Sequence, residues 1–289
     1  PEFRPVTRFW REPGKFFVDA PGDPSLHKAQ LLGVRGRFGL TGDAAIYVRQ
    51  AYRPGVPPSW EYDDLPNRYA PRITALSFDR GGFEVWSRNG AVEPLDDEYR
   101  IAVRPVRGAT NGNTYFPEKR LVVVHGPASD GDRMIEAFAV PDPDVVAARF
   151  LGGTIVHTDT VPSRPHDFEI IGPPLSEMVK FCLEKSDNCY AEHLLMMAAA
   201  KDRPLGDKPY KTAAERLTKF LEMQVGVEPG SVTTTDKPFK IGMVTFAGYA
   251  PLYLAKEKEL FDGLSVELHR IEEIASIRAG MANGTLDAY

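Results

Sequence analysis

The chain has 289 residues, of which 43% are hydrophobic and 26% charged, and its formal net charge is −5 at pH 7. This composition is typical of a globular protein with a buried core, and the length favours two domains or one large domain with insertions. The acidic balance and the lack of a basic run argue against nucleic-acid binding. The longest apolar stretches, such as HLLMMAAA, are far shorter than the roughly 20 residues that cross a bilayer, so no membrane span is expected.

The first 140 residues are predicted to be rich in strands and turns. Short runs of alternating or β-branched residues, bounded by Gly, Pro, Asn and Asp, are typical of strands. Such runs occupy residues 15–20, 45–52, 73–78, 82–88, 99–106, 119–126 and 133–140. The sequence DRGG between the third and fourth runs indicates a hairpin, and the Asn-Gly pair in GATNGNTYFPE predicts a turn.

From residue 141 to about residue 235 the apolar residues recur at helical spacing. Helices are therefore expected at residues 141–151, 175–185, 188–200 and 210–226. A proline, Pro141 or Pro143, suits the first turn of the first of these helices.

The pattern changes again near Asp236. Strands are expected at 239–246 and 264–271, alternating with helices at 250–261 and 274–284. This alternation is typical of βαβ units that form a parallel sheet.

The sequence as a whole predicts an α+β fold with three parts. These are a β-rich region over residues 1–140, a mainly helical region over 141–236 and a βαβα segment over 237–289.

One triplet between two of the expected helices can be interpreted in two ways. Ser186, Asp187 and Asn188 are all residue types that cap helices, so any of them could cap the helix that follows. Ser-Asp-Asn is also the second of three active-site motifs in a class of serine enzymes, whose other motifs are S-x-x-K and K-T-G. The triplet by itself favours the capping interpretation, so the choice between the two interpretations depends on the sequence around it.

Those surroundings resemble a known family. GPPLSEMVKFCLEKSDNCYAEHLL, residues 172–195, is similar to the pattern SPPLxELxxxxLxxSDNxxAExLL of the class C low-molecular-mass penicillin-binding proteins. Four further segments resemble the same family and follow in its order over residues 15–235. They are GDPSL at 22–26, SWEYDDLPNRYAPRITALSFDRGGFEV at 59–85, FAVPDPDVVAARFL at 138–151 and AERLTKFLEMQVGVEPGSV at 214–232.

The resemblance implies a D-alanyl-D-alanine carboxypeptidase or endopeptidase that acts on peptidoglycan in the periplasm or cell envelope. Its partners would be peptide stems or β-lactams, and it would need no cofactor. It implies that Ser186 relays protons and that Asn188 orients the amide of the substrate. It also implies that the β-rich half corresponds to an insertion between S-x-x-K and S-D-N. All three motifs are required, because a serine hydroxyl attacks only when it is deprotonated beside an oxyanion hole.

The other two motifs occur only as strings in the wrong context. SLHK, from Ser25 to Lys28, follows Pro24 in an expected turn and does not open a core helix. KTA begins at Lys211 in an expected helix, and Ala213 stands where the motif needs glycine. The sequence thus predicts a chain that lacks the nucleophile and K-T-G motifs and is inactive by itself. It begins at Pro1 without a signal peptide, as expected of a trimmed chain or an internal piece of a longer one.

The last part of the chain has a second resemblance. FKIGMVTFAGYAPLYLAKEKELFDGLSVELHRIEEIASIRAGMANGTLDAY is similar to the start of periplasmic solute-binding proteins of the taurine, nitrate and thiamine-precursor type. Ligands of such folds lie beyond the carboxyl ends of strands and near helix N-termini. The candidate solute-binding residues are therefore Thr245, Phe246, Gly248 and Tyr249, and a plain strand-to-helix loop is the alternative.

Three interpretations stay open at this point. The chain is part of a serine carboxypeptidase, or the small-solute-binding component of an ABC-type transporter, or a fused or engineered chain with no completed site. The abrupt change at TTTDKPFKIG supports the third interpretation. The six histidines have no zinc-site spacing, so no metal is expected. Cys182 and Cys189 are expected to be free thiols, because seven residues along one helix would separate them by about 10 Å.

Overall fold

The computed structural model is an α+β fold with several separate sheets. It describes residues 2–58, 60, 64–106, 112–125, 131–203, 205–226, 239–243 and 266–270. The chain divides into two compact units, Pro1–Ala213 and Ala214–Tyr289, which are described separately.

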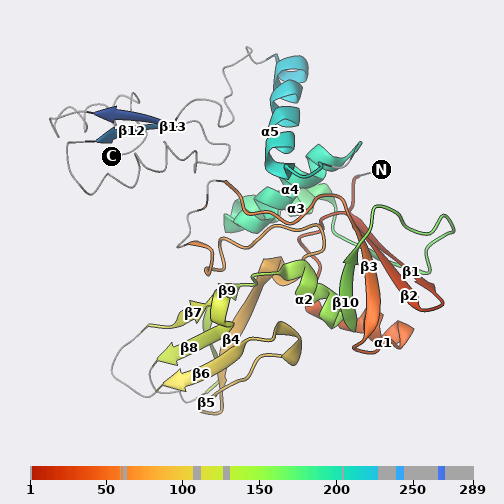
Figure 1. Ribbon diagram of the computed structural model, residues 1–289, viewed down its shortest axis with the longest axis vertical. Coiled ribbons are helices and arrows are strands. Elements are labelled where there is room, and N and C mark those ends of the chain that lie inside the picture. The colour runs from red at the N-terminus through yellow and green to blue at the C-terminus, as the bar shows by residue number, and fades with distance from the viewer. Residues whose placement is uncertain are drawn as a thin grey trace. The chain divides into compact units, whose positions relative to one another are not determined.

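The largest sheet of the described residues has five strands and lies in the first unit, at the right of Figure 1. Its strand order is β10-β3-β2-β1-β11, with β10 at Gly153–His157, β3 at Ala44–Gln50, β2 at Lys15–Ala20, β1 at Val6–Glu12 and β11 at Phe168–Ile171. The strands β2, β3 and β10 run parallel, whereas β1 is antiparallel to β2 and β11. Helix α1 (Lys28–Phe38) provides the crossover that the parallel pair β2 and β3 requires. Helix α2 (Pro143–Phe150) packs against α1 and β10.

Two three-stranded sheets lie together in the same unit, at the lower left of Figure 1. The first has the order β5-β4-β9, with β5 at Ala91–Val92, β4 at Gly82–Arg88 and β9 at Arg133–Ala139. The second has the order β6-β8-β7, with β6 at Ala102–Val106, β8 at Leu121–His125 and β7 at Thr114–Phe116. Short 3-10 turns lie at η2 (Asp79–Gly81), η3 (Asp97–Tyr99) and η4 (Pro117–Lys119).

An aromatic cluster joins these small sheets to the rest of the core. The ring of Phe83 lies 5.3 Å from that of Tyr115 and 5.8 Å from that of Phe138. The ring of Tyr99 lies 5.2 Å from that of Phe150 on α2. These buried rings belong to the same apolar cluster as the inward residues of the five-stranded sheet, so the unit has one main core.

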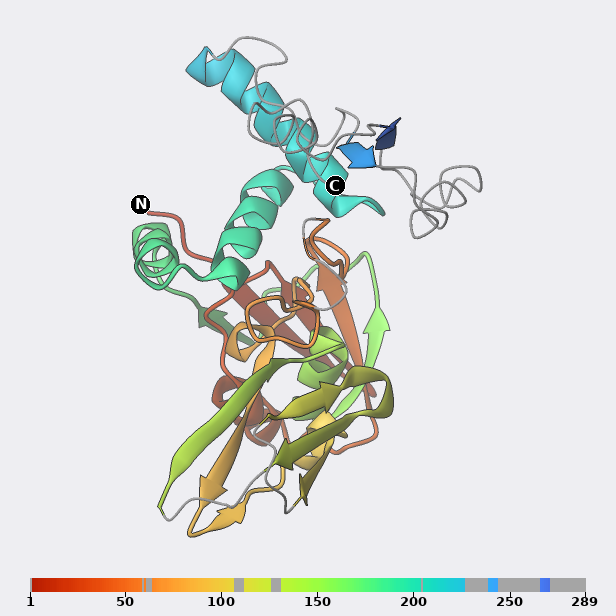
Figure 2. The same cartoon turned by 90° about the vertical axis from the view of Figure 1, so that its left-hand side faces the viewer.

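The helical segment follows β11 and contains the turn of interest (Figure 2). Helices α3 (Leu175–Lys185) and α4 (Asn188–Ala200) have the bounds expected from the periodicity. They pack against each other around Met178, Tyr190 and Met197, which form a small apolar cluster of their own. Helix α5 (Pro209–Phe220) continues into a π-helical turn, η5 (Leu221–Val225). No helix in the described part of the chain is long and apolar enough to span a membrane.

The hairpin expected over residues 73–88 is wrong. The run 73–78 is buried throughout but forms no strand, and only Ile73 makes an isolated bridge, to Gly55. Asp79 and Arg80 have positive φ values of 46° and 58°, so the chain turns sharply before β4, and β4 pairs with β5 and β9 instead. The run reads as a strand because burial on all sides requires apolar residues whether or not the backbone pairs.

Several elements were not expected from the sequence. They are β1, α1, β5, β7, β10 and β11. Two of them, β10 and β11, lie in the region expected to be mainly helical, and both join the five-stranded sheet. The strands at 99–106 and 119–126 are present as β6 and β8, but they pair in parallel, so the Asn-Gly pair between them does not close a two-stranded hairpin.

In the second unit, the described strands are β12 (Phe239–Met243) and β13 (Val266–Arg270). They pair in parallel with Phe239 opposite Val266, as the expected βαβ pattern requires. The expected helices at 250–261 and 274–284, the boundary near Asp236 and the residues Thr245, Phe246, Gly248 and Tyr249 lie outside the described residues.

Candidate functional site

The Ser-Asp-Asn triplet forms the turn between α3 and α4. Ser186 ends α3 in the left-handed conformation, with φ 50° and ψ 47°. Asp187 is the N-cap of α4, and its Oδ1 accepts a hydrogen bond of 3.0 Å from the backbone N–H of Tyr190. Of the three capping candidates, Asp187 is therefore the one whose side chain caps the helix, as the preferences for this position allow.

An arginine from a distant part of the chain anchors this turn. The Nη1 of Arg80 donates to Asp187 Oδ2 at 2.9 Å, and the Arg80 guanidinium lies 5.8 Å from the centre of the Phe181 ring on α3. The side chain of Asp187 is only 13% exposed and that of Arg80 is 37% exposed, so the carboxylate is largely shielded from water and the guanidinium is partly exposed. Arg80 thus contacts both helices that flank the turn. The sequence gives no sign of this role, because Arg80 precedes Asp187 by 107 residues.

Ser186 and Asn188, the two predicted catalytic residues, are both exposed. The Nδ2 of Asn188 donates to the backbone oxygen of Tyr69 at 3.0 Å. Within the described part of the chain, the hydroxyl of Ser186 makes no hydrogen bond. The turn therefore holds Asp187 inward and leaves the side chains on either side of it at the surface.

Both cysteines near the turn are free thiols. The Sγ of Cys182 lies 3.6 Å from the backbone oxygen of Asp187. Cys189 is buried, and burial raises the pKa of its thiol far above the ordinary value. Neither thiol has the lowered pKa of a nucleophilic cysteine.

A buried histidine connects α4 to the loop after β2. The Nδ1 of His193 lies 2.6 Å from the hydroxyl oxygen of Tyr52 and 3.0 Å from the backbone oxygen of Gly22. Burial penalises the imidazolium and lowers the pKa of His193 to about 4, so the ring is neutral at pH 7. His193 was not identified as a site residue from the sequence. The one local feature that could have indicated it is its position on the inner face of the predicted helix.

The loop after β2 also contains the string SLHK. The Oγ of Ser25 donates to Asp23 Oδ1 at 2.6 Å, and the Nζ of Lys28 donates to Asp96 Oδ2 at 2.6 Å. Ser25 lies in a turn before α1, whereas Lys28 is the first helical residue. The serine and the lysine therefore bind different carboxylates, and the arrangement is not that of a lysine-activated nucleophile.

The string KTA lies in a helix, as the sequence predicted. Lys211 is exposed on α5 and Ala213 is buried, so the string does not lie on a strand edge. In the described ranges, no group of three or more His, Cys, Asp or Glu residues could hold a metal ion.

Comparison with solved structures finds a similar fold. The chain is 17% identical to penicillin-binding protein 4 from Haemophilus influenzae, with a TM-score of 0.51 over 75% of this chain and 58% of that chain. The same protein complexed with a β-lactam is 17% identical, with a TM-score of 0.47 over 75% of this chain and 56% of that one. No protein-family model and no curated protein matches the sequence.

The similarity establishes a penicillin-binding-protein-like fold. At 17% identity it concerns the fold alone, and the chain spans 58% of the length of the first similar structure. The chemistry must therefore be argued from the residues of the turn.

Proposed function

We propose that residues from about 15 to 235 form the β-rich and S-D-N-bearing part of a serine-type D-alanyl-D-alanine carboxypeptidase or endopeptidase acting on peptidoglycan in the cell envelope. In this role Ser186 relays protons and Asn188 orients the amide of the substrate. The observation that carries the proposal is the anchored turn, which exposes these two side chains within a penicillin-binding-protein-like fold.

The geometry supports this role because a proton relay must be both accessible and fixed in position. Ser186 is accessible, and the cap and ion pair of Asp187 fix the backbone beside it. The remaining Nδ2 hydrogen and the Oδ1 of Asn188 are available to a substrate, because its bond to Tyr69 uses one donor only.

The proposal includes the prediction that this chain does not form an acyl-enzyme by itself. Ser25 binds Asp23 and Lys28 binds Asp96, so neither supplies the activated nucleophile that acyl transfer requires. The nucleophile and the K-T-G strand would come from the part of the fold that this chain does not cover.

The test is labelling with a fluorescent penicillin, read by intact-mass analysis. The chain alone is expected to give no covalent adduct. The chain joined to the S-x-x-K and K-T-G segments of penicillin-binding protein 4 from Haemophilus influenzae is expected to give one adduct per molecule. In the joined protein, Ser186→Ala is expected to slow labelling about 100-fold or more, as removal of an acid–base group does.

Ser25→Ala is the matched control, because it removes a hydroxyl from the other serine motif and should leave the labelling rate unchanged. Circular dichroism and thermal unfolding establish that each protein is folded. A folded joined protein that is not labelled, or one labelled equally fast after Ser186→Ala, would contradict the proposal. An adduct on Ser25 of the chain alone would show that SLHK is the nucleophile motif.

A second function is proposed for the segment 237–289, the capture of a small solute as part of an ABC-type transporter. The observation that favours it is the parallel pairing of β12 and β13, which fits the opening βαβ unit of the solute-binding fold that the sequence resembles. Thr245, Phe246, Gly248 and Tyr249 would then contact the solute.

Isothermal titration with taurine and with nitrate tests the second function. Saturable binding that is lost in Tyr249→Ala is expected, with Tyr253→Ala as the control. If neither taurine nor nitrate binds and no joined protein is labelled, the remaining interpretation is a fused or engineered chain with no completed site.

A further inference from the structure

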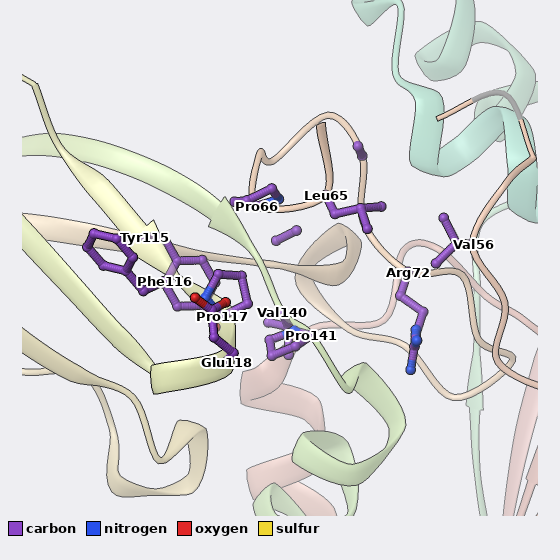
Figure 3. A pocket seen from close by; sticks show the side chains of 12 residues that line it. Val56, Leu65, Pro66, Arg72, Tyr115, Phe116, Pro117, Glu118, Val140 and Pro141 are labelled. Atoms are coloured by element: carbon purple, nitrogen blue, oxygen red, sulfur yellow. The ribbon is translucent and has the colours of Figure 1, made fainter. Parts of the chain in front are cut away.

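A cavity of about 320 Å³ lies beside the small sheets (Figure 3). Residues from three stretches of the chain line it: five between Val56 and Arg72, four from β7 into η4, and three from the end of β9 to Pro141. Its volume is at the lower end of the roughly 300–1,000 Å³ range of small-molecule sites, so it suits one small molecule and not a polymer.

The walls of the cavity are mostly apolar and rigid. Pro66, Pro117 and Pro141 come from the three different stretches, and Leu65 and Phe116 line the cavity beside Pro66 and Pro117 (Figure 3). Because a proline ring restricts the backbone, the three prolines keep the shape of the cavity without a ligand. An apolar group can therefore enter a preformed space at little conformational cost.

Two opposite charges complete the lining. Arg72 directly precedes the buried run 73–78 and Glu118 belongs to η4, and they lie on opposite sides of the cavity (Figure 3). The Nη1 of Arg72 lies 3.6 Å from Asp142 Oδ1, whereas Arg120 Nη2 binds Asp142 Oδ2 at 2.7 Å. Arg120 thus already neutralises Asp142, and the Arg72 guanidinium can turn to an incoming carboxylate.

Glu118, like Arg72, is available to bind a charged group of a ligand. It is exposed, and among the described residues no cation lies within ion-pair distance of its carboxylate. A cation and an anion on opposite sides of an apolar cavity match a ligand that has both charges and an apolar group.

We propose that this cavity binds a small zwitterion, an α-amino acid or a dipeptide with one branched or aromatic apolar side chain. Its carboxylate binds the Arg72 guanidinium, its ammonium group binds the Glu118 carboxylate, and its side chain packs among the prolines and Phe116. This site is separate from the acyl-transfer function proposed above and does not depend on it.

Isothermal titration of the full chain at neutral pH and low salt tests the site. The probes are L-leucine and L-leucyl-L-alanine, with 4-methylpentanoate, which lacks the ammonium group, and 3-methylbutylamine, which lacks the carboxylate. At least one zwitterion is expected to bind saturably with one molecule per chain. The acid and the amine are each expected to bind about tenfold more weakly, because each loses one charged contact.

Two variants then assign the contacts. Arg72→Gln is expected to weaken the binding of the zwitterion and of the acid about tenfold and to leave the affinity for the amine unchanged. Glu118→Gln is expected to weaken the binding of the zwitterion and of the amine and to leave the affinity for the acid unchanged. Both positions are exposed, so both variants should fold, which thermal unfolding checks.

The matched controls are Arg104→Gln on β6 and Glu136→Gln on β9, which remove the same charges from exposed positions outside the cavity. Neither should change binding. The proposal is overturned if neither zwitterion binds, if the acid and the amine bind as tightly as the zwitterions, or if both cavity variants bind them normally.

Discussion

Two turns in this molecule combine an aspartate with a serine, and the same carboxylate chemistry has opposite effects on the serine. In the turn after β2, Asp23 takes the hydroxyl of Ser25 as a hydrogen-bond donor. In the turn between α3 and α4, Asp187 binds Arg80 and the helix backbone, and Ser186 stays exposed. The comparison shows that a motif string has chemical meaning only where its local hydrogen bonds leave the reactive group accessible.

The two aspartates also differ in burial and charge. Asp23 is buried, which raises the pKa of its carboxyl, and its Oδ2 has no hydrogen-bond partner among the described residues. Asp187 has an arginine for one oxygen and a helix N–H for the other. The first turn is thus buried and tied to its own backbone, and the second is an exposed junction held by a distant residue.

The largest expected effect on stability comes from adding a methyl group at Gly22 in the buried turn. Gly22 has φ +99°, and a Cβ there would clash with the hydroxyl group of the buried Tyr52. Gly22→Ala is therefore expected to lower the free energy of unfolding by about 4 kcal/mol, through backbone strain and overpacking together. Urea unfolding followed by tryptophan fluorescence measures it.

Gly14→Ala is the control for this substitution. Gly14 also has a positive φ, +72°, but nothing lies within 4 Å of its added Cβ. It should cost only about 1 kcal/mol, the strain of the left-handed conformation alone. Equal losses in the two variants would show that the contact with Tyr52 has no part in the effect.

A pH dependence is expected from His193, which binds the backbone of the buried turn. Its folded-state pKa of about 4 lies below the ordinary 6.5, so only the unfolded state gains a proton between these values. The stability that His193 contributes is present above pH 6.5 and is lost as pH falls to about 4. The difference corresponds to about 3 kcal/mol. Unfolding at pH 7.5 and pH 4.5 measures it.

His193→Gln should flatten this dependence relative to the unchanged chain. At low pH, protonation of Asp23 stabilises the fold, which is opposite to the effect of protonating His193, because the raised pKa of Asp23 favours the protonated folded state. The comparison with the variant isolates the histidine. An identical pH dependence in both proteins would assign the loss of stability to other groups.

A smaller effect is expected at the exposed turn. Asp187→Ala removes the N-cap of α4 and the ion pair with Arg80, so a loss of about 2 kcal/mol is expected. Asp207→Ala removes the exposed pair with Arg53, whose N···O distance is 3.5 Å, and should change stability by less than about 0.5 kcal/mol. Urea unfolding compares the two, and equal effects would mean that Asp187 does not anchor the turn.

The smallest pair of effects tests the two serines directly. Ser25→Ala removes a donor from the buried Asp23 and should cost about 1 kcal/mol. Ser186→Ala should change the free energy of unfolding by less than about 0.5 kcal/mol, because the exposed hydroxyl makes no hydrogen bond in the described part of the chain. A larger cost for Ser186 than for Ser25 would reverse the comparison between the turns.

The local elements of the candidate site could be predicted from the sequence. Periodicity and capping preferences located α3 and α4 with their observed bounds and placed the triplet between them. The resemblance also indicated the penicillin-binding-protein-like fold. The roles of Ser186 and Asn188 stay predictions, as do those of the four solute-binding candidates, which lie outside the described residues.

The sequence by itself determined what depends on neighbours along the chain: helix periods, caps, the strands β2 and β4 and the turn that precedes α4. Only the tertiary structure decided that the run 73–78 stays unpaired, that Arg80 anchors Asp187, and that Arg72 and Glu118 face one cavity. The physical reason is the separation along the sequence over which each kind of interaction acts. Backbone and capping preferences act within a few residues, whereas pairing, ion pairs and cavities depend on segments that meet only when the core forms.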